Sequence, residues 1–181
     1  MVSLRFLSLT CILLLAACTS HQQRPAPSRD AWKLEGKLAI VSTNQSQQAN
    51  VRWVSQDGDY DILLFGPLGQ GKIHIRKQGD KIELTDGKDK VDAGSPEELL
   101  YKTTGLTLPV SLLQYWVIGR PAPDIPFSYK HQSAYGQLTG FVQAGWQVHF
   151  DEYITHFPEK IKMHNADGIK LTLVVKKWSR P

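Results

Sequence analysis

The chain has 181 residues, and 21 lysines and arginines against 17 aspartates and glutamates give it a formal net charge of +4 and a pI near 9.0. Acidic and basic residues are interspersed, without a run of like charge. The only two cysteines, Cys11 and Cys18, lie close to the N-terminus, which argues against a fold held together by disulfides. The residues beyond them suffice for one domain with a hydrophobic core.

The first eighteen residues predict export. An apolar run over 4–15 contains one early basic residue, Arg5, and ends in Leu15-Ala16-Ala17-Cys18. The run is too short to span a bilayer and is typical of a secretory signal, here residues 1–17. Its ending resembles the lipobox of bacterial lipoproteins, in which the cysteine after the cut receives a diacylglycerol. The alternative is an ordinary cleavage site followed by a chance cysteine.

A lipidated Cys18 would hold the protein to a membrane without any transmembrane segment, because its acyl chains together provide stable anchoring. Residues 18–30 are polar and contain Pro25 and Pro27, so we expect a flexible tether. Thr19 replaces the aspartate that favours inner-membrane retention in enterobacterial lipoproteins, which points to the periplasmic face of the outer membrane. An exported location makes nucleic acid a poor partner.

From Trp32 onward, apolar and polar residues alternate with a period of two, which predicts strands with one buried face. Asp57-Gly58 and Asp86-Gly87 are typical of tight hairpins, so neighbouring strands should pair antiparallel. A turn is expected over 44–47. The strands expected in this half are 32–40, 51–53, 60–65, 72–77, 81–85 and 90–93.

The pattern changes at Ser95, which we expect to cap a helix that begins with Pro96 and ends near Gly105. Pro109 begins a second helical stretch, whose apolar residues recur at spacings of three and four until Gly119. Residues 120–126 contain three prolines and predict an extended loop.

Alternation returns after this loop, with turns expected at 144–145, 157–158 and 167–168. The strands expected are 127–131, 136–143, 146–153, 160–164 and 169–178. The resulting fold class is mainly β with α: a strongly curved antiparallel sheet of about eleven strands, an open half-barrel over 31–181, with helices over its concave apolar face.

Sequence signatures of enzymes are missing: the chain has no G-x-S-x-G, H-E-x-x-H, P-loop or G-x-G-x-x-G motif. No histidine has a metal-ligand spacing to another ligand, and His74 and His149 fall at the polar phase of their strands. We therefore expect no catalytic activity, no metal and no cofactor besides the covalent lipid.

The segment over 65–71, Phe-Gly-Pro-Leu-Gly-Gln-Gly, joins two predicted strands without continuing either. Leu68 lies between Pro67 and Gly69, where few neighbours could cover it. It either projects into solvent or folds back onto the edge of the sheet.

Taken in order, several segments resemble the LolB family of outer-membrane lipoprotein receptors. They are Trp32–Ile40, Gly66–Gly69, Leu112–Pro123, Gly145–Tyr153 and Ile169–Trp178. The related carrier family LolA has a similar fold without the lipid anchor, so Cys18 distinguishes the two. One departure is the short stretch before the first strand, which leaves no room for a helix found in some members and predicts a smaller helical lid.

The resemblance implies a half-barrel with a helical lid that takes acylated lipoproteins from a LolA-like carrier and inserts them into the outer membrane. It places the membrane-insertion loop at Pro67, Leu68 and Gly69. It also implies an apolar cavity for acyl chains, although any one lining residue could instead belong to an ordinary core. The cavity candidates are Leu38, Ile40, Trp53, Ile62, Leu64, Ile73, Ile75, Leu113, Trp116, Val117, Trp146, Val148 and Phe150.

The expected partners are thus the carrier, the acylated cargo and outer-membrane lipid, with the protein acting as a monomer. An alternative is a structural or assembly lipoprotein of the outer membrane that binds proteins and has no acyl-chain cavity. An apolar void facing the sheet would count against it.

Overall fold

The computed structural model describes residues 31–181, apart from positions 70, 88, 93, 135 and 155. The predicted signal peptide, Cys18 and the tether over 18–30 lie outside the described residues. The strands are β1 (Trp32–Val41), β2 (Ser46–Gln56), β3 (Asp59–Phe65), β4 (Ile73–Gln78), β5 (Lys81–Thr85), β6 (Lys90–Asp92), β7 (Phe127–Gln132), β8 (Leu138–Gln143), β9 (Trp146–Ile154), β10 (Phe157–Asn165) and β11 (Lys170–Ser179). The helices are α2 (Pro96–Thr104), α3 (Val110–Trp116) and a short 3-10 turn, η1 (Pro67–Gly69).

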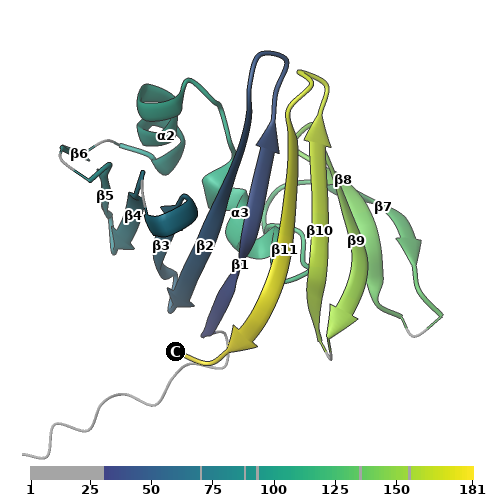
Figure 1. Cartoon of the computed structure of the whole chain (residues 1–181). Coiled ribbons are helices and arrows are strands. Elements are labelled where there is room, and N and C mark those ends of the chain that lie inside the picture. Colours follow the sequence, from purple (N-terminus) through teal and green to yellow (C-terminus); the bar gives the residue numbers. More distant parts are fainter. Residues whose placement is uncertain (1–30, 70, 88, 93, 135, 155) are drawn as a thin grey trace, which may run out of the picture.

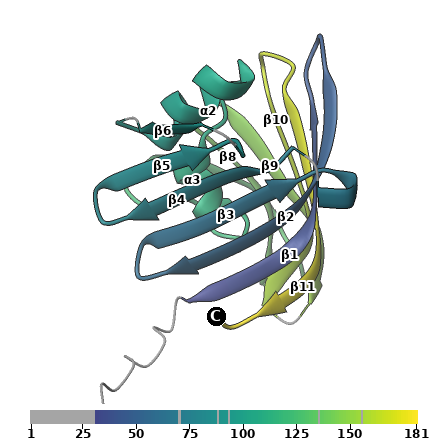
Figure 2. The same cartoon turned by 60° about the vertical axis from the view of Figure 1, so that its left-hand side comes forward.

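The strands form one antiparallel sheet in the order β6-β5-β4-β3-β2-β1-β11-β10-β9-β8-β7. This confirms the predicted architecture, an open and strongly curved sheet (Figures 1 and 2). Its edges are β6 and β7, whereas its centre is the pairing of the first strand with the last, where Leu38 faces Leu173. The segments before and after the helices therefore form opposite wings of a single sheet.

The pairing of β1 with β11 is irregular at one point. The register shifts between Glu35 and Gly36, which is a β-bulge, and bulges increase local twist. A Cβ at Gly36 would lie 2.3 Å from the carbonyl oxygen of Val174, closer than any side chain permits. The close approach of the two strands thus depends on glycine, and it helps to give the sheet a concave face.

Helix α2 begins and ends where the sequence predicts, whereas α3 begins as predicted but ends at Trp116, three residues before the expected Gly119. The hydroxyl of Ser95 accepts a hydrogen bond from the Glu98 amide at 3.1 Å, and Gly105 ends α2 in a left-handed conformation with φ of 71°. A carboxylate oxygen of Glu97 accepts from the amide of Ser111 at 2.7 Å, which ties α2 to the start of α3. Both helices lie on the concave side of the sheet (Figures 1 and 2).

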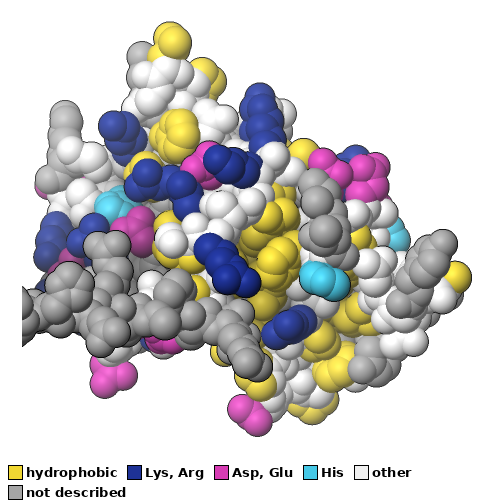
Figure 3. All heavy atoms as spheres, turned by 90° about the horizontal axis from the view of Figure 1, so that it is seen from below, with side chains coloured by type: hydrophobic (Ala, Val, Ile, Leu, Met, Phe, Trp, Pro, Cys, Tyr) yellow, Lys and Arg dark blue, Asp and Glu magenta, His cyan; other side chains and the backbone are white. Residues whose placement is uncertain are grey.

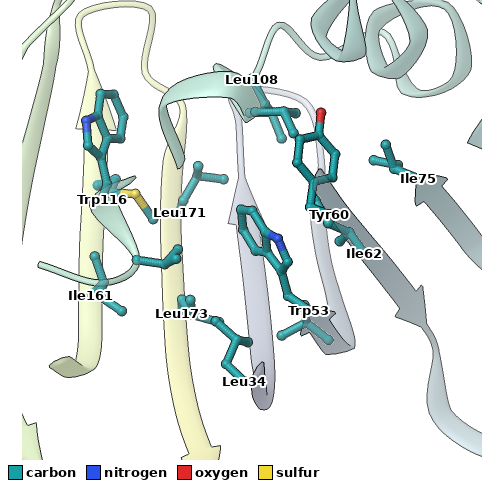
Figure 4. Close-up of a cluster of buried hydrophobic side chains, with 14 of the residues drawn as sticks. Leu34, Trp53, Tyr60, Ile62, Ile75, Leu108, Trp116, Ile161, Leu171 and Leu173 are labelled. Atoms are coloured by element: carbon teal, nitrogen blue, oxygen red, sulfur yellow. The ribbon is translucent and has the colours of Figure 1, made fainter. Parts of the chain in front are cut away.

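Aromatic side chains fill the core beneath α3. The Trp116 ring lies 6.1 Å from that of Phe141 and 6.3 Å from that of Trp146, and Phe141 lies 5.8 Å from Phe150. Trp116 is completely buried and projects over β10 (Figure 4). This half of the concave face is therefore occupied by packed rings.

Two predicted turns were misplaced. Phe157 and Pro158 begin β10 instead of forming a turn, since a proline is tolerated at the start of a strand, where its missing N–H costs little. Phe157 stacks on Trp178 at 4.7 Å, and the Trp178 indole donates to the carbonyl oxygen of Pro158 at 3.0 Å. The turn expected over 44–47 is shorter than predicted, because β2 already begins at Ser46.

Candidate functional site

The concave face holds a cavity of about 220 Å³ between the sheet and the helices. Side chains from β1 to β4 form one wall, β10 and β11 contribute another, and α2, α3 and their connection cover it. The lining is Leu38, Ile40, Gln47, Gln48, Ala49, Val51, Trp53, Ile62, Leu64, Gly66, Gly71, Ile73, Ile75, Leu100, Thr104, Leu106, Leu108, Val110, Leu113, Val117, Met163, Leu171 and Leu173. It contains no charged residue, so an apolar ligand fits it best.

The alternating pattern of the strands explains the apolar lining. Trp53, Ile62 and Leu173 project from β2, β3 and β11 on the same side of the sheet (Figure 4). Trp53 pairs with Ile62, and Ile62 pairs with Ile75, so one apolar row crosses three strands. Because side chains in a strand alternate between faces, residues two apart enter the same cavity.

The structure places nine of the thirteen cavity candidates in the lining. They are Leu38, Ile40, Trp53, Ile62, Leu64, Ile73, Ile75, Leu113 and Val117. The other four, Trp116, Trp146, Val148 and Phe150, also face inward but lie in the packed core beneath α3. These four residues were expected to line the cavity but do not, because aromatic rings fill the space over β8 and β9.

Fourteen further lining residues were not among the candidates, and four of them are Gln47, Gln48, Gly66 and Gly71. Leu106 and Leu108 come from the connection between the helices, where no periodicity marks an inward face, whereas Val110 shares the predicted apolar face of α3. Leu171 and Leu173 lie in a predicted strand at its apolar phase, so alternation alone could have identified them. The others are Ala49, Val51, Leu100, Thr104 and Met163.

Two buried polar atoms lack a partner among the described residues: the indole nitrogen of Trp53, whose ring lines one wall of the cavity, and the hydroxyl of Tyr60, which lies outside the lining. The two rings lie 6.4 Å apart, edge to face. Burial raises the pKa of Tyr60, and the nearby carboxylate of Glu97 raises it further. The absence of a hydrogen-bond partner leaves this wall of the cavity without a strong polar interaction.

The predicted loop projects from the end of β3, and two of its glycines, Gly66 and Gly71, belong to the cavity lining. The amide of Gly69 donates to the carbonyl oxygen of Gly66 at 3.1 Å and closes a tight turn. Leu68 at its tip has φ of 61° and ψ of 16° and is 98% exposed. The alternative in which Leu68 folds onto the sheet edge is therefore wrong.

The direction of this turn separates it from the helices. η1 lies on the convex side of the sheet, whereas α2 and α3 lie on the concave side, and the two views agree on this (Figures 1 and 2). Leu68 thus projects away from the cavity covering, although the base of its loop borders the cavity.

Charged groups outside the cavity form ion pairs on the convex face. Asp151 accepts from Lys162 at 2.7 Å and lies 3.0 Å from His149, and the pKa of its carboxyl is lowered chiefly by Lys162. Asp61 pairs with His74 at 2.9 Å. Across the described part of the chain, no group of three His, Cys, Asp or Glu side chains could hold a metal ion. No helix in that part is long and apolar enough to cross a membrane.

Known proteins are similar to this chain both in sequence and in fold. The sequence profile of the family described as "Outer membrane lipoprotein LolB" matches residues 30–178. The outer-membrane lipoprotein LolB of Cellvibrio japonicus is 36% identical over 168 residues, covering 88% of this chain and 82% of the relative. That of Pseudomonas aeruginosa is 33% identical over 195 residues, covering 96% and 94%.

Among solved structures, a LolA superfamily protein from Nitrosomonas europaea is similar in fold, with a TM-score of 0.51 and 10% identity over 85% of this chain and 87% of that one. The half-barrel fold is thus shared with the LolA superfamily, while the sequence matches extend over nearly the whole described domain. The chain that builds this open sheet, its apolar cavity and its exposed Leu68 belongs to the LolB family of outer-membrane lipoproteins.

Proposed function

We propose that this protein accepts acylated lipoproteins from a LolA-like periplasmic carrier and inserts them into the outer membrane. The observation that carries the proposal is the uncharged cavity over β1 to β4, whose lining includes Gly66 and Gly71 at the base of the Leu68 loop. Membership of the family supports the outer membrane as its location.

An apolar cavity avoids the energetic cost of exposing acyl chains to water. Moving one sixteen-carbon acyl chain from a membrane into water costs roughly 12 kcal/mol, at about 0.8 kcal/mol per CH₂ group. Such a cargo needs continuous apolar contact, which residues such as Ile62, Ile75 and Leu171 supply. A receiver must also bind the cargo better than the carrier does, since otherwise the hand-over would run backwards.

The same proposal assigns roles to the other parts of the chain. Residues 1–17 are a signal peptide, Cys18 carries the lipid that anchors the protein, and residues 18–30 are the tether to the domain over 31–181. Helices α2 and α3 act as a lid over the cavity, and Pro67, Leu68 and Gly69 contact the bilayer. Binding and release of acyl chains need neither a catalytic group nor a cofactor.

The cavity also weighs against an assembly lipoprotein that binds only proteins. Such a protein would gain stability by packing side chains into this space, because voids in a core forfeit contacts. The packed rings beneath Trp116 show what a filled core looks like in this same sheet.

A charge placed inside the cavity tests the proposal. Leu38 lines the cavity, whereas its neighbour Ala39 points to the opposite face of β1 and is not part of the lining. We expect Leu38→Glu to reduce the transfer of cargo from loaded carrier by more than tenfold, because an unpaired charge in an apolar site costs several kcal/mol. Ala39→Glu is the matched control and should transfer cargo normally.

Transfer is measured by pulling down the tagged carrier and quantifying the cargo that has moved to this protein. Circular dichroism confirms that both variants are folded. Equal transfer by the two folded variants would show that acyl chains bind elsewhere, and would remove the cavity from the mechanism.

A further inference from the structure

The convex side of the sheet carries a cluster of cations around a single acid. Across the sheet, Lys177 pairs in register with Glu35, and Glu35 pairs with Arg52. Because of the bulge at Gly36, the neighbouring Lys176 is also exposed on this side. Among the described residues, the only salt bridge here joins Lys33 to Glu35 at 2.7 Å, so Arg52, Lys176 and Lys177 form none.

The surface around Glu35 has an excess of positive charge. Lys33, and to a smaller degree Lys177 and Arg52, lower the pKa of the Glu35 carboxyl, so these cations lie close enough to act on one acid together. A single carboxylate cannot neutralise four cations, and the excess charge faces solvent.

Apolar side chains lie beside these cations, against the usual alternation of the sheet. Arg52 pairs with Leu63, and Asn50 pairs with Phe65, and both apolar residues occupy the convex side of β3. Together with Gly36 they line a shallow groove bordered by Arg52, Lys176 and Lys177. An apolar floor with a cationic rim fits an amphiphile whose polar end is an anion.

This groove and the membrane-insertion loop lie on the same side of the molecule. Phe65 is the last residue of β3, and Leu68 follows it after two residues. η1 faces the viewer in Figure 1, with the helices behind the sheet. In the view from below, several lysine and arginine side chains lie in the upper half of the picture, the side that faces the viewer in Figure 1, and others lie across the middle (Figure 3).

We propose that this groove, lined by Leu63, Phe65, Arg52, Lys176 and Lys177, binds the headgroup of an anionic phospholipid in the bilayer that Leu68 enters. The proposal rests on the proposed function in that a membrane meets Leu68. A single leucine can insert into the bilayer but does not fix the orientation of the domain. A cationic surface beside it would orient the convex face toward the bilayer. Phosphate oxygens would contact the cations of the rim, and the first methylene groups of an acyl chain would lie on the apolar floor.

The shared position of the groove and the Leu68 loop on the convex side favours a bilayer over an acidic protein as the ligand of the groove. A membrane contacts Leu68 and the groove at once, because both project from the convex side of β3 and its neighbours. The cavity lining includes Gly66 and Gly71 at the base of the same loop, so this orientation also brings the cavity near the lipid surface.

Lysine footprinting on the lipidated, full-length protein tests the proposal. The protein is added to zwitterionic vesicles or to vesicles that also contain phosphatidylglycerol, acylated with a membrane-impermeant reagent, and read by mass spectrometry. We expect Lys176 and Lys177 to lose reactivity severalfold only with phosphatidylglycerol, and to recover it at high salt. Lys102 belongs to α2, the helix on the concave side of the sheet, and serves as the internal reference.

A charge variant links the protection to the groove. Arg52→Gln should weaken the protection of Lys176 and Lys177 by about fivefold, since one cation near an anionic surface contributes that much to binding. Arg120→Gln removes the same charge outside the groove and should leave the protection unchanged. Equal reactivity of Lys176 and Lys177 in both kinds of vesicle would overturn the proposal, as would equal protection by acidic carrier protein without vesicles.

Cargo transfer measured in the same vesicles separates the two proposals. Normal transfer without protection of Lys176 and Lys177 would overturn lipid binding by the groove and leave the proposed function standing. Protection without transfer would support the groove and contradict the proposed function.

Discussion

The side-chain amide of Gln143 holds the indole of Trp116, whose nitrogen donates to the amide oxygen at 2.8 Å. The same oxygen accepts from the amide of Ala122 at 2.8 Å, and the amide nitrogen donates to the carbonyl oxygens of Ala122 and Ile125, each at 2.9 Å. Gln143 is 1% exposed, so one buried group joins β8, α3 and the loop over 120–126.

Replacing this glutamine should be costly. Gln143→Leu removes the partner of four polar groups, three of them in buried hydrogen bonds, and each buried unsatisfied group costs about 1–3 kcal/mol, so we expect the unfolding free energy to fall by at least about 3 kcal/mol. Urea denaturation followed by tryptophan fluorescence measures the change. Gln78→Leu, at an exposed strand end, is the control and should change stability by less than about 0.5 kcal/mol. A small effect at position 143 would mean that water replaces the lost contacts.

The second prediction concerns the bulge in β1. Gly36→Ala places a Cβ against the carbonyl oxygen of Val174, which only a shift of backbone can relieve, so we expect a loss of about 2 kcal/mol or more in unfolding free energy. Gly94 is the matched control, because a Cβ there meets nothing closer than 3.9 Å and its φ is not positive. Equal stability of Gly36→Ala and Gly94→Ala in thermal unfolding would contradict the role of the close approach.

The sequence predicts which face of a strand a side chain occupies better than it predicts the surroundings of that side chain in the folded sheet. Alternation decided which face of each strand is inner, and for this reason Leu38, Ile62 and Ile75 were placed correctly in the cavity wall. It could not decide where along the sheet a side chain lies. Trp116 faces inward as its helical spacing predicts, yet the neighbouring Phe141 and Trp146 make its surroundings a packed core.

The loop of Leu68 marks a different limit. Glycines at 66, 69 and 71 predicted a break in the strands, but exposure of the leucine depends on its left-handed backbone, which no periodicity reveals. Pro158 shows the reverse case, in which a residue that usually interrupts strands lies at the start of one, where its missing N–H costs little.

Two tyrosines predict the response to alkaline pH. Burial raises the pKa of Tyr153 to about 12, and it raises that of Tyr60 as well. Because the folded-state pKa lies above the unfolded value of about 10, their contribution to stability is complete below pH 10 and is lost as the pH rises toward 12. Unfolding free energy should therefore decrease above pH 10 by up to about 1.4 kcal/mol per pH unit for each tyrosine.

The two phenylalanine variants should differ at neutral pH. Tyr153→Phe removes a hydrogen bond to the carbonyl oxygen of Leu138 and should cost about 1 kcal/mol, whereas the Tyr60 hydroxyl has no described partner and Tyr60→Phe should cost nothing. Each variant should also flatten the alkaline decrease in urea titrations. An unchanged slope in the double variant would show that other groups govern it.

For Leu68 we expect a separation of two steps. Burying a leucine side chain in the membrane interface is favourable by roughly 1.5–3 kcal/mol, and a carboxylate there is not. Leu68→Glu should thus leave acceptance of cargo from the carrier near normal and reduce transfer into liposomes severalfold. Val41→Glu changes another exposed apolar residue, at the far end of β1, and should affect neither step. A parallel fall of both steps would place Leu68 in cargo binding instead.

The lipid anchor gives the last prediction. Cys18→Ser should abolish incorporation of radioactive palmitate, because serine lacks the thiol that the lipobox reaction modifies. The domain should remain folded by circular dichroism, since its described core lies entirely within residues 31–181. Persistent labelling would show that the sequence over 15–18 is an ordinary cleavage site.

The pairing of β1 with β11 has a consequence for the order of assembly. The strands that meet at the centre of the sheet are the earliest and the latest of the domain to be synthesised, and Lys33 lies opposite Ser179. Each wing can form from contacts close in sequence, but their union requires a closure over nearly the whole domain, and such non-local pairing is slow. Until Lys170–Ser179 is available to pair with β1, the two wings remain separate and each has an unpaired strand edge. A chaperone that covers those edges would act at this stage.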